Sequence, residues 1–273
     1  MGSDEVKRLA RQSGADLVGI APVERFADLP AEADPARIQP EARSVIVLGF
    51  QVPRGALRGA EHGTAYHTVA DGRPVTMFVE MTYLFCRELE EDGWEAVPLW
   101  RQSPGLRRQG VQVAPGRPEP EVILDMDYAA HAAGLGHLGM GKFFLTPEFG
   151  PRQVFTAVVT DLELEPDAPF AGTMCDRCGA CARACPAGAL SADVVREAAL
   201  CEGKAEWYSL RVENCRICKT GILSNPYSGD AEPWRVGAAC GRACVAHLED
   251  SGMLRRTFRS PFRGPGQGEG GSC

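Results

Sequence analysis

The sequence has no long apolar run, and its charge balance is acidic rather than basic. No hydrophobic stretch among its 273 residues approaches the roughly 20 residues that a transmembrane helix needs. The formal net charge is −7, so the chain has no broad cationic surface to hold a nucleic-acid backbone. Its first residues, MGSDEVKRLARQSG, contain neither an apolar secretory segment nor a twin-arginine signal. We therefore expect a cytoplasmic protein with no membrane partner and no nucleic-acid partner.

Cysteine, in contrast, is abundant and unevenly distributed. The chain has 11 cysteines, and nine of them fall between residues 175 and 244. A secreted disulfide scaffold would be shorter and would spread its cysteines evenly, whereas clustered thiols in a reducing compartment more often bind metal. The distribution therefore predicts a metal-binding module in the C-terminal part of the chain.

The N-terminal part alternates between helix and strand patterns. We expect helices at residues 4–12, 75–91 and 127–133, and strands at 15–21, 43–50, 95–99, 121–124 and 153–160. The strand at 43–50 is apolar on both faces, which indicates an internal position in a sheet. Residues 54–74 and 104–120 show no clear period and predict irregular loops of the kind that line binding sites.

These patterns together predict three regions. Alternating strands and helices predict an α/β domain at residues 1–166. The cysteine-rich module follows at residues 167–254, and residues 255–273 form a basic and then glycine-rich tail.

The cysteine module begins with the run CDRCGACARACP at residues 175–186. Its spacing, C-x2-C-x2-C-x3-C-P, is the run by which bacterial ferredoxins bind iron–sulfur clusters. Three thiolates two residues apart can surround one face of a 4Fe–4S cluster, while the fourth reaches a neighbouring cluster. A zinc knuckle is the alternative, but zinc sites use paired C-x2-C motifs rather than three evenly spaced cysteines. The run therefore predicts the ligands Cys175, Cys178, Cys181 and Cys185.

The fourth thiolate of the run is expected to bind a second cluster, and that cluster needs further cysteine ligands. Such cysteines follow in the sequence. The candidates are Cys201, Cys215, Cys218, Cys240 and Cys244. Counting four ligands for each cluster, we expect one 4Fe–4S cluster on the first three cysteines of the run with Cys244. The other cluster would then be held by Cys185, Cys201, Cys215 and Cys218. An alternative uses Cys240 in the second cluster and leaves Cys201 outside it.

The segment before the module carries a resemblance to a known superfamily. Residues 129–152 read AAHAAGLGHLGMGKFFLTPEFGPR, residues 158–164 read VVTDLEL, and the ferredoxin run comes next. This order resembles the epoxyqueuosine reductases and reductive dehalogenases, in which a similar segment precedes two ferredoxin-type clusters. The resemblance extends from about residue 3 to residue 250.

The resemblance implies a nitroreductase-like α/β domain that binds cobalamin, followed by a small ferredoxin-like domain with two 4Fe–4S clusters. The clusters would pass electrons from an external low-potential donor, of ferredoxin or flavodoxin type, to the cobalt. Glycines would let the backbone approach a flat macrocycle closely. The residues that the resemblance assigns to the cofactor are Gly134, Gly136, His137, Gly139, Gly141 and Arg152.

The sequence also departs from the epoxyqueuosine reductases. These enzymes carry a Val-Asp pair whose aspartate donates a proton, and Pro120 and Glu121 stand near that place here. Their C-terminal helical repeats have no counterpart in the sequence. We therefore expect a divergent member of the superfamily rather than a typical epoxyqueuosine reductase.

A reduction that saturates or breaks a bond usually needs a proton donor near the acceptor. The best-placed candidates are Asp127, Tyr128 and His131, immediately before the glycines. Asp127 and His131 are four residues apart on one helical face and could share a proton. An aspartate at a helix start is also a routine cap, and a single histidine often has no catalytic role.

The sequence thus predicts an iron–sulfur oxidoreductase, cobalamin-dependent by resemblance, that reduces a small organic substrate. Two alternatives stay open: an electron-transfer protein without cobalamin, and a reductase with another cofactor or with substrate bound directly to a cluster. The roughly 165 residues before the cysteines favour an enzyme, because a minimal ferredoxin has no need of them.

Overall fold

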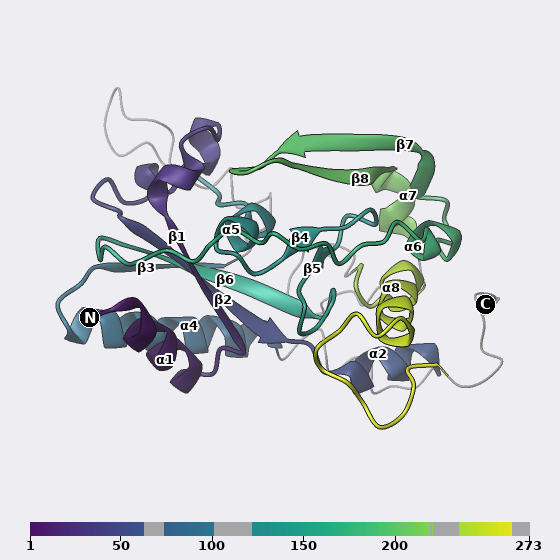
Figure 1. Cartoon of the computed structure of the whole chain (residues 1–273), viewed down its shortest axis with the longest axis horizontal. Coiled ribbons are helices and arrows are strands. Elements are labelled where there is room, and N and C mark those ends of the chain that lie inside the picture. The colour runs from purple at the N-terminus through teal and green to yellow at the C-terminus, as the bar shows by residue number, and fades with distance from the viewer. Residues whose placement is uncertain (63–73, 101–121, 219, 221–234, 264–273) are drawn as a thin grey trace. The chain divides into compact units, whose positions relative to one another are not determined.

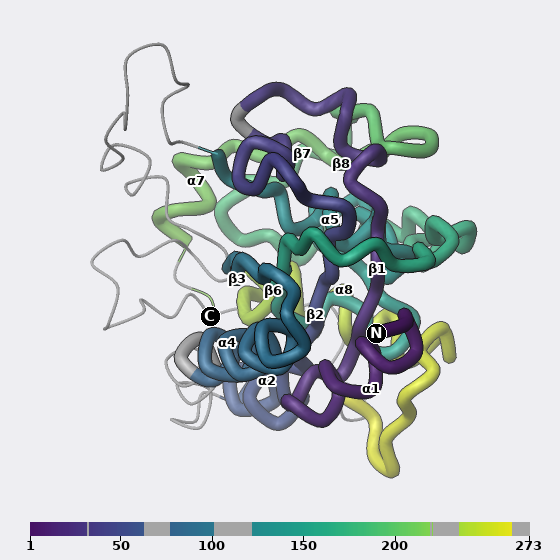
Figure 2. The backbone as a smooth tube through the Cα atoms, turned by 90° about the vertical axis from the view of Figure 1, so that its left-hand side faces the viewer, coloured from purple at the N-terminus to yellow at the C-terminus, as the bar shows by residue number. Residues whose placement is uncertain are grey.

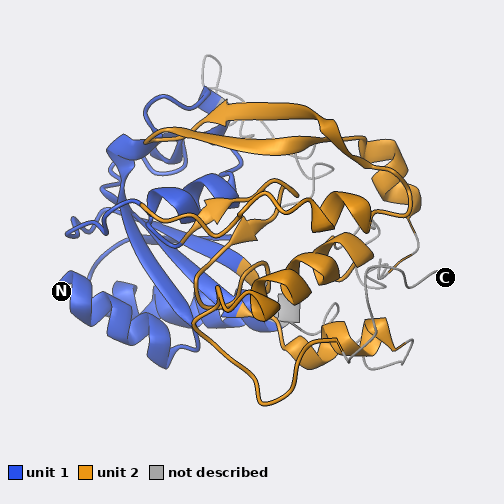
Figure 3. Cartoon of the chain, turned by 45° about the vertical axis from the view of Figure 1, so that its right-hand side comes forward, with its two compact units in different colours: residues 1–50, 77–135, 155–170 blue, residues 51–76, 136–154, 171–273 orange. Residues whose placement is uncertain are grey.

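The structure is a computed structural model that describes residues 1–62, 74–100, 122–218, 220 and 235–263. The chain forms two compact units, shown in Figure 3. Unit 1 consists of residues 1–50, 77–135 and 155–170, and unit 2 consists of residues 51–76, 136–154 and 171–273. Each unit is therefore assembled from separate stretches of sequence. The three linear regions expected from the sequence remain a prediction.

Unit 1 is built on a four-stranded sheet with the order β1-β2-β6-β3. Its strands are β1 (Leu17–Pro22), β2 (Ser44–Gln51), β3 (Ala96–Trp100) and β6 (Gln153–Thr160). β1 pairs antiparallel with β2, with Leu17 opposite Gly49, and β3 pairs antiparallel with β6, with Ala96 opposite Thr160. Seven of the eight residues of β2 are buried, which confirms the prediction of an internal strand.

Helices cover both faces of this sheet, as Figures 1 and 2 show. α1 (Ser3–Gln12) and α4 (Pro74–Glu91) lie on one face, and α5 (Met126–Ala132) lies on the other. The ring of Phe78 on α4 stacks on Phe50 with 4.8 Å between centroids. Gly19 of β1 lets α5 approach closely, because a Cβ there would come within 2.3 Å of the Ala133 carbonyl oxygen. The sheet and its helices therefore bury a continuous apolar core.

Three short 3-10 helices connect β1 to β2 in unit 1. They are η1 (Val23–Phe26), η2 (Ala31–Ala33) and η3 (Pro35–Arg37). Phe26 of η1 is fully buried and packs against the ring of Tyr128, with 5.5 Å between centroids. This contact anchors the segment between β1 and β2 to α5.

Unit 2 combines short helices and strands with buried arginine side chains. Its elements are α2 (Arg54–Glu61), β4 (His137–Leu138), β5 (Phe144–Leu145), α6 (Ala180–Arg183), β7 (Leu190–Ala199), β8 (Lys204–Leu210), α7 (Val212–Ile217) and α8 (Ala239–Asp250). β4 pairs with β5, β7 pairs with β8, and α6 packs against α8.

Buried charges hold the C-terminal segment of unit 2. Arg54 forms a 2.7 Å ion pair with Glu249 of α8 and donates to the Ser260 carbonyl oxygen at 2.9 Å. The guanidinium of Arg54 also lies 3.8 Å from the centre of the Phe258 ring. Residues 258–262, which lie in the stretch expected to form a tail, are therefore packed against the rest of this unit.

The structure corrects two of the sequence predictions. Residues 54–61 form helix α2 rather than an irregular loop, because Leu57 has a buried contact with Val245 and Phe262 that the sequence pattern did not show. Residues 122–124 form no strand. The hairpin of β7 and β8 was not predicted, and the expected loop at 104–120 lies outside the described residues.

The remaining sequence predictions of regular structure are close to the observed elements. The strand at 153–160 has the predicted bounds, and the helix expected at 75–91 begins one residue earlier. Among the described residues, no helix is both long and apolar enough to cross a membrane. The cytoplasmic location remains a prediction.

Candidate functional site

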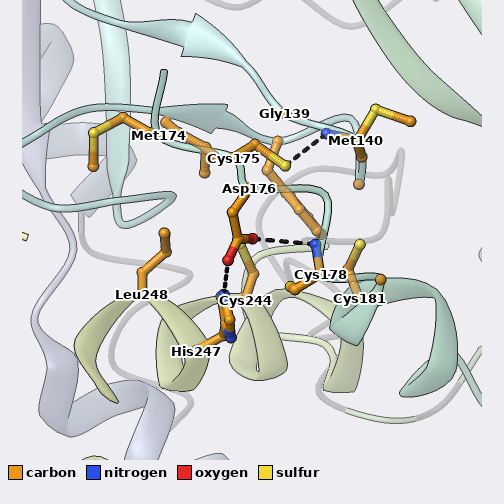
Figure 4. A pocket seen from close by; sticks show the side chains of 14 residues that line it. Gly139, Met140, Met174, Cys175, Asp176, Cys178, Cys181, Cys244, His247 and Leu248 are labelled. Atoms are coloured by element: carbon orange, nitrogen blue, oxygen red, sulfur yellow. Dashed lines mark hydrogen bonds and ion pairs between the residues drawn. The ribbon is translucent and has the colours of Figure 1, made fainter. Parts of the chain in front are cut away.

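Four thiols of unit 2 line one pocket. Figure 4 shows the side chains of Cys175, Cys178, Cys181 and Cys244 around it. The first three come from the ferredoxin run at the start of α6, and Cys244 comes from α8. We call these four cysteines the first thiol set.

The backbone of the run turns tightly around the pocket. Arg177 and Gly179 adopt left-handed conformations, with φ of 61° and 75°. Glycine accepts this conformation without steric cost, which explains its place two residues before Cys181. The turn directs the amides of Ala180 and Ala182 toward the sulfurs of Cys178 and Cys181. Small residues in the run therefore allow backbone amides to donate hydrogen bonds to sulfur.

A second loop, residues 139–143, forms another wall of the pocket. The Met140 amide donates to the Cys175 sulfur at 3.4 Å. At Gly141, an added Cβ would lie 3.0 Å from the Cys181 sulfur and 2.7 Å from the Phe143 ring. A side chain at this position would displace the Cys181 sulfur, so the geometry of the first thiol set depends on Gly141.

Burial and mutual repulsion raise the pKa of Cys178, Cys181 and Cys244 in the absence of a cation. Burial raises the pKa of Cys181 to about 12, and the neighbouring thiols add to this rise. Burial also raises the pKa of Cys244 well above its usual value, although the side chain keeps some exposed surface where it borders the pocket. Such thiols ionise when bound metal neutralises their charge. The donor set therefore fits a polynuclear metal cluster with cysteine ligands.

An ion pair lies at the edge of this pocket. His247 of α8, one helical turn after Cys244, lies 2.7 Å from Asp176. Burial would raise the pKa of Asp176, but hydrogen bonds from His247 and the Cys178 amide hold it below its usual value. The sequence analysis missed both residues. The Cys-x-x-His spacing, which places two side chains on one face of a helix, could have indicated His247.

A second thiol set consists of Cys185, Cys215, Cys218 and Cys240. Burial, together with the thiols of Cys185 and Cys215, raises the pKa of Cys240 to about 11. Burial likewise raises the pKa of Cys215, with Cys218 and Cys185 adding to the effect. Each of these thiols thus lies within electrostatic range of others in the set. Cys240 also acts on Cys181 and Cys244, so the two sets are neighbours.

The structure does not bring Cys201 to this second set. Cys201 lies in the turn between β7 and β8, beyond the pair formed by Ala199 and Lys204. Cys185 lies near the opposite end of the hairpin, where its sulfur accepts a 3.2 Å hydrogen bond from the Ala189 amide. The six residue steps of β8 separate the two ends by roughly 20 Å. The geometry therefore favours the alternative in which Cys240 joins the second set.

The residues assigned to cobalamin by resemblance have contacts within the protein. At Gly134 and Gly136, an added Cβ would come within 2.3 Å of the Ala168 carbonyl oxygen and 2.0 Å of the Leu145 carbonyl oxygen. At Gly139, a Cβ would lie 2.8 Å from Leu145. The four assigned glycines, Gly141 included, therefore each have a packing reason that needs no macrocycle.

His137 and Arg152 are also engaged within unit 2. The Met174 amide donates to Nε2 of His137 at 2.5 Å. Arg152 is fully buried, donates to the Val52 carbonyl oxygen at 2.9 Å, and has a pKa that burial lowers to about 10. Each of these residues thus has contacts within the protein, and its assignment to cobalamin remains a prediction.

The proton-donor candidates all lie on α5 in unit 1. The Tyr128 hydroxyl donates to the Arg25 carbonyl oxygen at 2.7 Å, which gives it a structural contact. Asp127 is exposed and His131 is buried. Asp125 caps the helix by accepting from the amides of Asp127 and Tyr128. A catalytic role for any of the three candidates remains a prediction.

Comparison with known proteins supports the chemistry of the thiols. Residues 173–191 match the family described as 4Fe-4S binding domain. This match covers the first three cysteines of the first thiol set and Cys185.

Two curated relatives and one solved structure extend the comparison. A tetrachloroethene reductive dehalogenase of Desulfitobacterium hafniense is 27% identical over 281 residues, which cover 86% of this chain and 44% of that protein. An epoxyqueuosine reductase of Synechococcus sp. (strain CC9605) is 27% identical over 231 residues, which cover 73% of this chain and 64% of that protein. The chain thus spans less than half of the dehalogenase's length.

The solved structure is one described as a reductive dehalogenase that suggests a mechanism for B12-dependent dehalogenation. It aligns with a TM-score of 0.56 and 22% identity, covering 88% of this chain and 30% of that chain. The similarity confirms the predicted mixed α/β fold with a ferredoxin-like part.

Proposed function

From the premise that this chain is a divergent relative of both the reductive dehalogenases and the epoxyqueuosine reductases, we propose that it is an iron–sulfur oxidoreductase. It holds two 4Fe–4S clusters and receives electrons from an external low-potential donor protein. These electrons reduce a small organic substrate, with cobalamin as the further cofactor suggested by the relatives. Its fold and its match to the 4Fe-4S family support this proposal.

The observation that carries the proposal is the presence of two neighbouring sets of four thiols in unit 2. Cys175, Cys178, Cys181 and Cys244 would hold one cluster, and the second thiol set would hold the other. Four thiolate ligands for each cluster match the usual ligation of a 4Fe–4S centre. When bound, such clusters supply one-electron transfer at low potential.

The residues of the chain position these ligands and adjust their electrostatics. The amides of Met140, Ala180 and Ala182 face sulfurs of the first set, and the amide of Ala189 faces Cys185. Hydrogen bonds of this kind stabilise negative charge on sulfur and help to set a reduction potential. Burial of Cys181, Cys215 and Cys240 limits the access of water.

Cobalamin enters the proposal through the relatives alone. The residues that the resemblance assigns to it make contacts within the protein, so their positions do not require a corrin. This same observation favours a second candidate function. An electron-transfer protein would have the two clusters without any corrin.

Iron analysis of anaerobically purified protein tests the clusters. We expect about eight iron and eight sulfide atoms for each wild-type chain, as two 4Fe–4S clusters require. Cys240→Ser should lose about half of the iron, whereas Cys201→Ser should keep all of it, because only Cys240 lies with the second thiol set. Full iron content in Cys240→Ser would contradict the assignment, and zinc without iron in the wild type would overturn the proposal itself.

Reconstitution with cobalamin separates the enzyme from the electron carrier. We expect the cluster-loaded protein to retain corrin through gel filtration and to show corrin absorption bands beside the broad cluster absorption. Protein that keeps its clusters but retains no corrin would favour the electron-transfer function.

A further inference from the structure

Arg235, which follows α7 in sequence, connects the loop of the first thiol set to the cysteines of the second. Its Nη2 donates to the Gly141 carbonyl oxygen at 2.7 Å, and its Nη1 donates to the Lys142 carbonyl oxygen at 3.1 Å. The guanidinium lies 4.7 Å from the centre of the Phe143 ring. Gly141 and Phe143 both line the pocket of the first thiol set. Arg235 therefore holds one wall of that pocket in place.

The same arginine lies beside the second thiol set. The Cys240 sulfur lies 3.9 Å from the Arg235 carbonyl oxygen. The side chain of Arg235 also lies within hydrogen-bonding range of the Cys215 sulfur. A fixed positive charge next to these sulfurs stabilises any negative charge that they carry.

One donor of this guanidinium has no partner among the described residues. Nε of Arg235 is buried from solvent and makes no hydrogen bond in the described part of the chain. A buried N–H without an acceptor is costly, and each such group in a folded protein calls for an explanation. A cluster bound at Cys215, whose sulfur the Arg235 side chain reaches, would supply this acceptor.

We propose that Arg235 tunes the cluster of the second thiol set by donating a hydrogen bond from Nε to one of its sulfurs. This inference rests on the proposed function, because it requires an iron–sulfur cluster at that site. Reduction adds one electron from the external donor to the cluster, and no covalent bond to Arg235 forms or breaks. A cation and a hydrogen bond favour the more negative, reduced state. Arg235 is thus a positioning residue that raises the reduction potential of this cluster.

The test compares two variants that remove the same charge. Arg235→Gln removes the buried donor and its charge, whereas Arg216→Gln removes an exposed arginine adjacent to Cys215. Each variant is purified anaerobically with its clusters, its iron is counted, and both cluster potentials are measured by EPR during a reductive titration. Arg235→Lys keeps the charge without the planar guanidinium.

We expect Arg235→Gln to make one of the two clusters about tenfold harder to reduce, a downward shift of about 59 mV for a one-electron couple. Release of that one cluster by Arg235→Gln, with Arg216→Gln unchanged, would support the same assignment. Arg235→Lys should lie between the wild type and Arg235→Gln. Iron contents and potentials that do not differ between Arg235→Gln and Arg216→Gln would overturn the inference. Wild-type protein without iron would instead show that the proposed function is wrong.

Discussion

The two units of this chain use different means to stabilise their interiors. Unit 1 buries an apolar core, in which residues such as Ile46 and Phe85 are fully inaccessible to solvent. Unit 2 buries thiols and charged side chains, among them Cys240 and the fully buried Arg152. Hydrophobic burial needs no ligand, whereas clustered thiols that bind metal couple folding to that metal. The stability of unit 1 can therefore come from its own side chains, whereas the stability of unit 2 depends on the metal that its cysteines bind.

Removal of metal should produce the largest difference between the units. Cys244→Ala takes away the ligand that α8 contributes to the first thiol set, so we expect local unfolding of α6 and α8 because cluster binding and folding are coupled. Hydrogen exchange measured by mass spectrometry should show protection in Ala239–Asp250 falling by about tenfold or more. Protection in Ser44–Gln51 should stay at its wild-type level. Equal losses in both segments would show that unit 1 also depends on the clusters.

A cavity in unit 1 should have the reverse effect. Phe85 on α4 is fully buried, so Phe85→Ala should lower the free energy of unfolding of this unit by about 3–5 kcal/mol. The iron content should stay unchanged. Urea denaturation followed by circular dichroism, with parallel iron analysis, measures both quantities.

Tyr83→Ala is the control on the same helix. Tyr83 is 56% exposed, so its truncation should change the free energy of unfolding by no more than about 0.5 kcal/mol. Loss of iron in Phe85→Ala but not in Tyr83→Ala would indicate that the apolar core also supports the thiol sets.

The buried charges of unit 2 should give an effect of similar size within that unit. Glu249→Gln leaves Arg54 buried without its counter-charge and should destabilise unit 2 by about 3 kcal/mol. Glu197→Gln removes an exposed ion pair with Lys204 and should cost no more than about 1 kcal/mol. Urea denaturation of the two variants measures the difference. Equal costs would mean that the buried pair contributes little to unit 2.

The smallest effect concerns the single described thiol of unit 1. Burial raises the pKa of Cys86 to about 12 from 9.0. Its protonated form is thus favoured in the folded state, and the stability that this confers is complete below about pH 9 and is lost as the pH rises toward 12. Between pH 9 and 10 the loss should approach about 1 kcal/mol. Cys86→Ala should remove this part of the pH dependence.

Urea midpoints of wild type and Cys86→Ala, measured with the clusters loaded, provide the test. The ligand thiols of unit 2 contribute the same pH dependence in both proteins, so the difference between the two pH slopes reports Cys86 alone. If the urea midpoints of the two proteins changed equally with pH, Cys86 would make no contribution to the pH dependence of folding.

The sequence by itself determined the local features that depend on short-range patterns. Apolar runs identified β2 and β6, and the cysteine spacing identified the ligand run from Cys175 to Cys185. Each of these signals depends on residues that lie within about ten positions of one another. Periodicity and ligand spacing are local properties, so they can be read before the chain folds.

Only the tertiary structure decided how distant residues come together. It separated Cys201 from the second thiol set by the length of β8 and placed Cys240 there instead, because the pairing of two strands is not encoded in cysteine spacing. It also placed Arg235 between the two thiol sets and used Gly136 and Gly141 for close internal packing. These outcomes depend on which backbones approach each other, and that is a property of the folded chain.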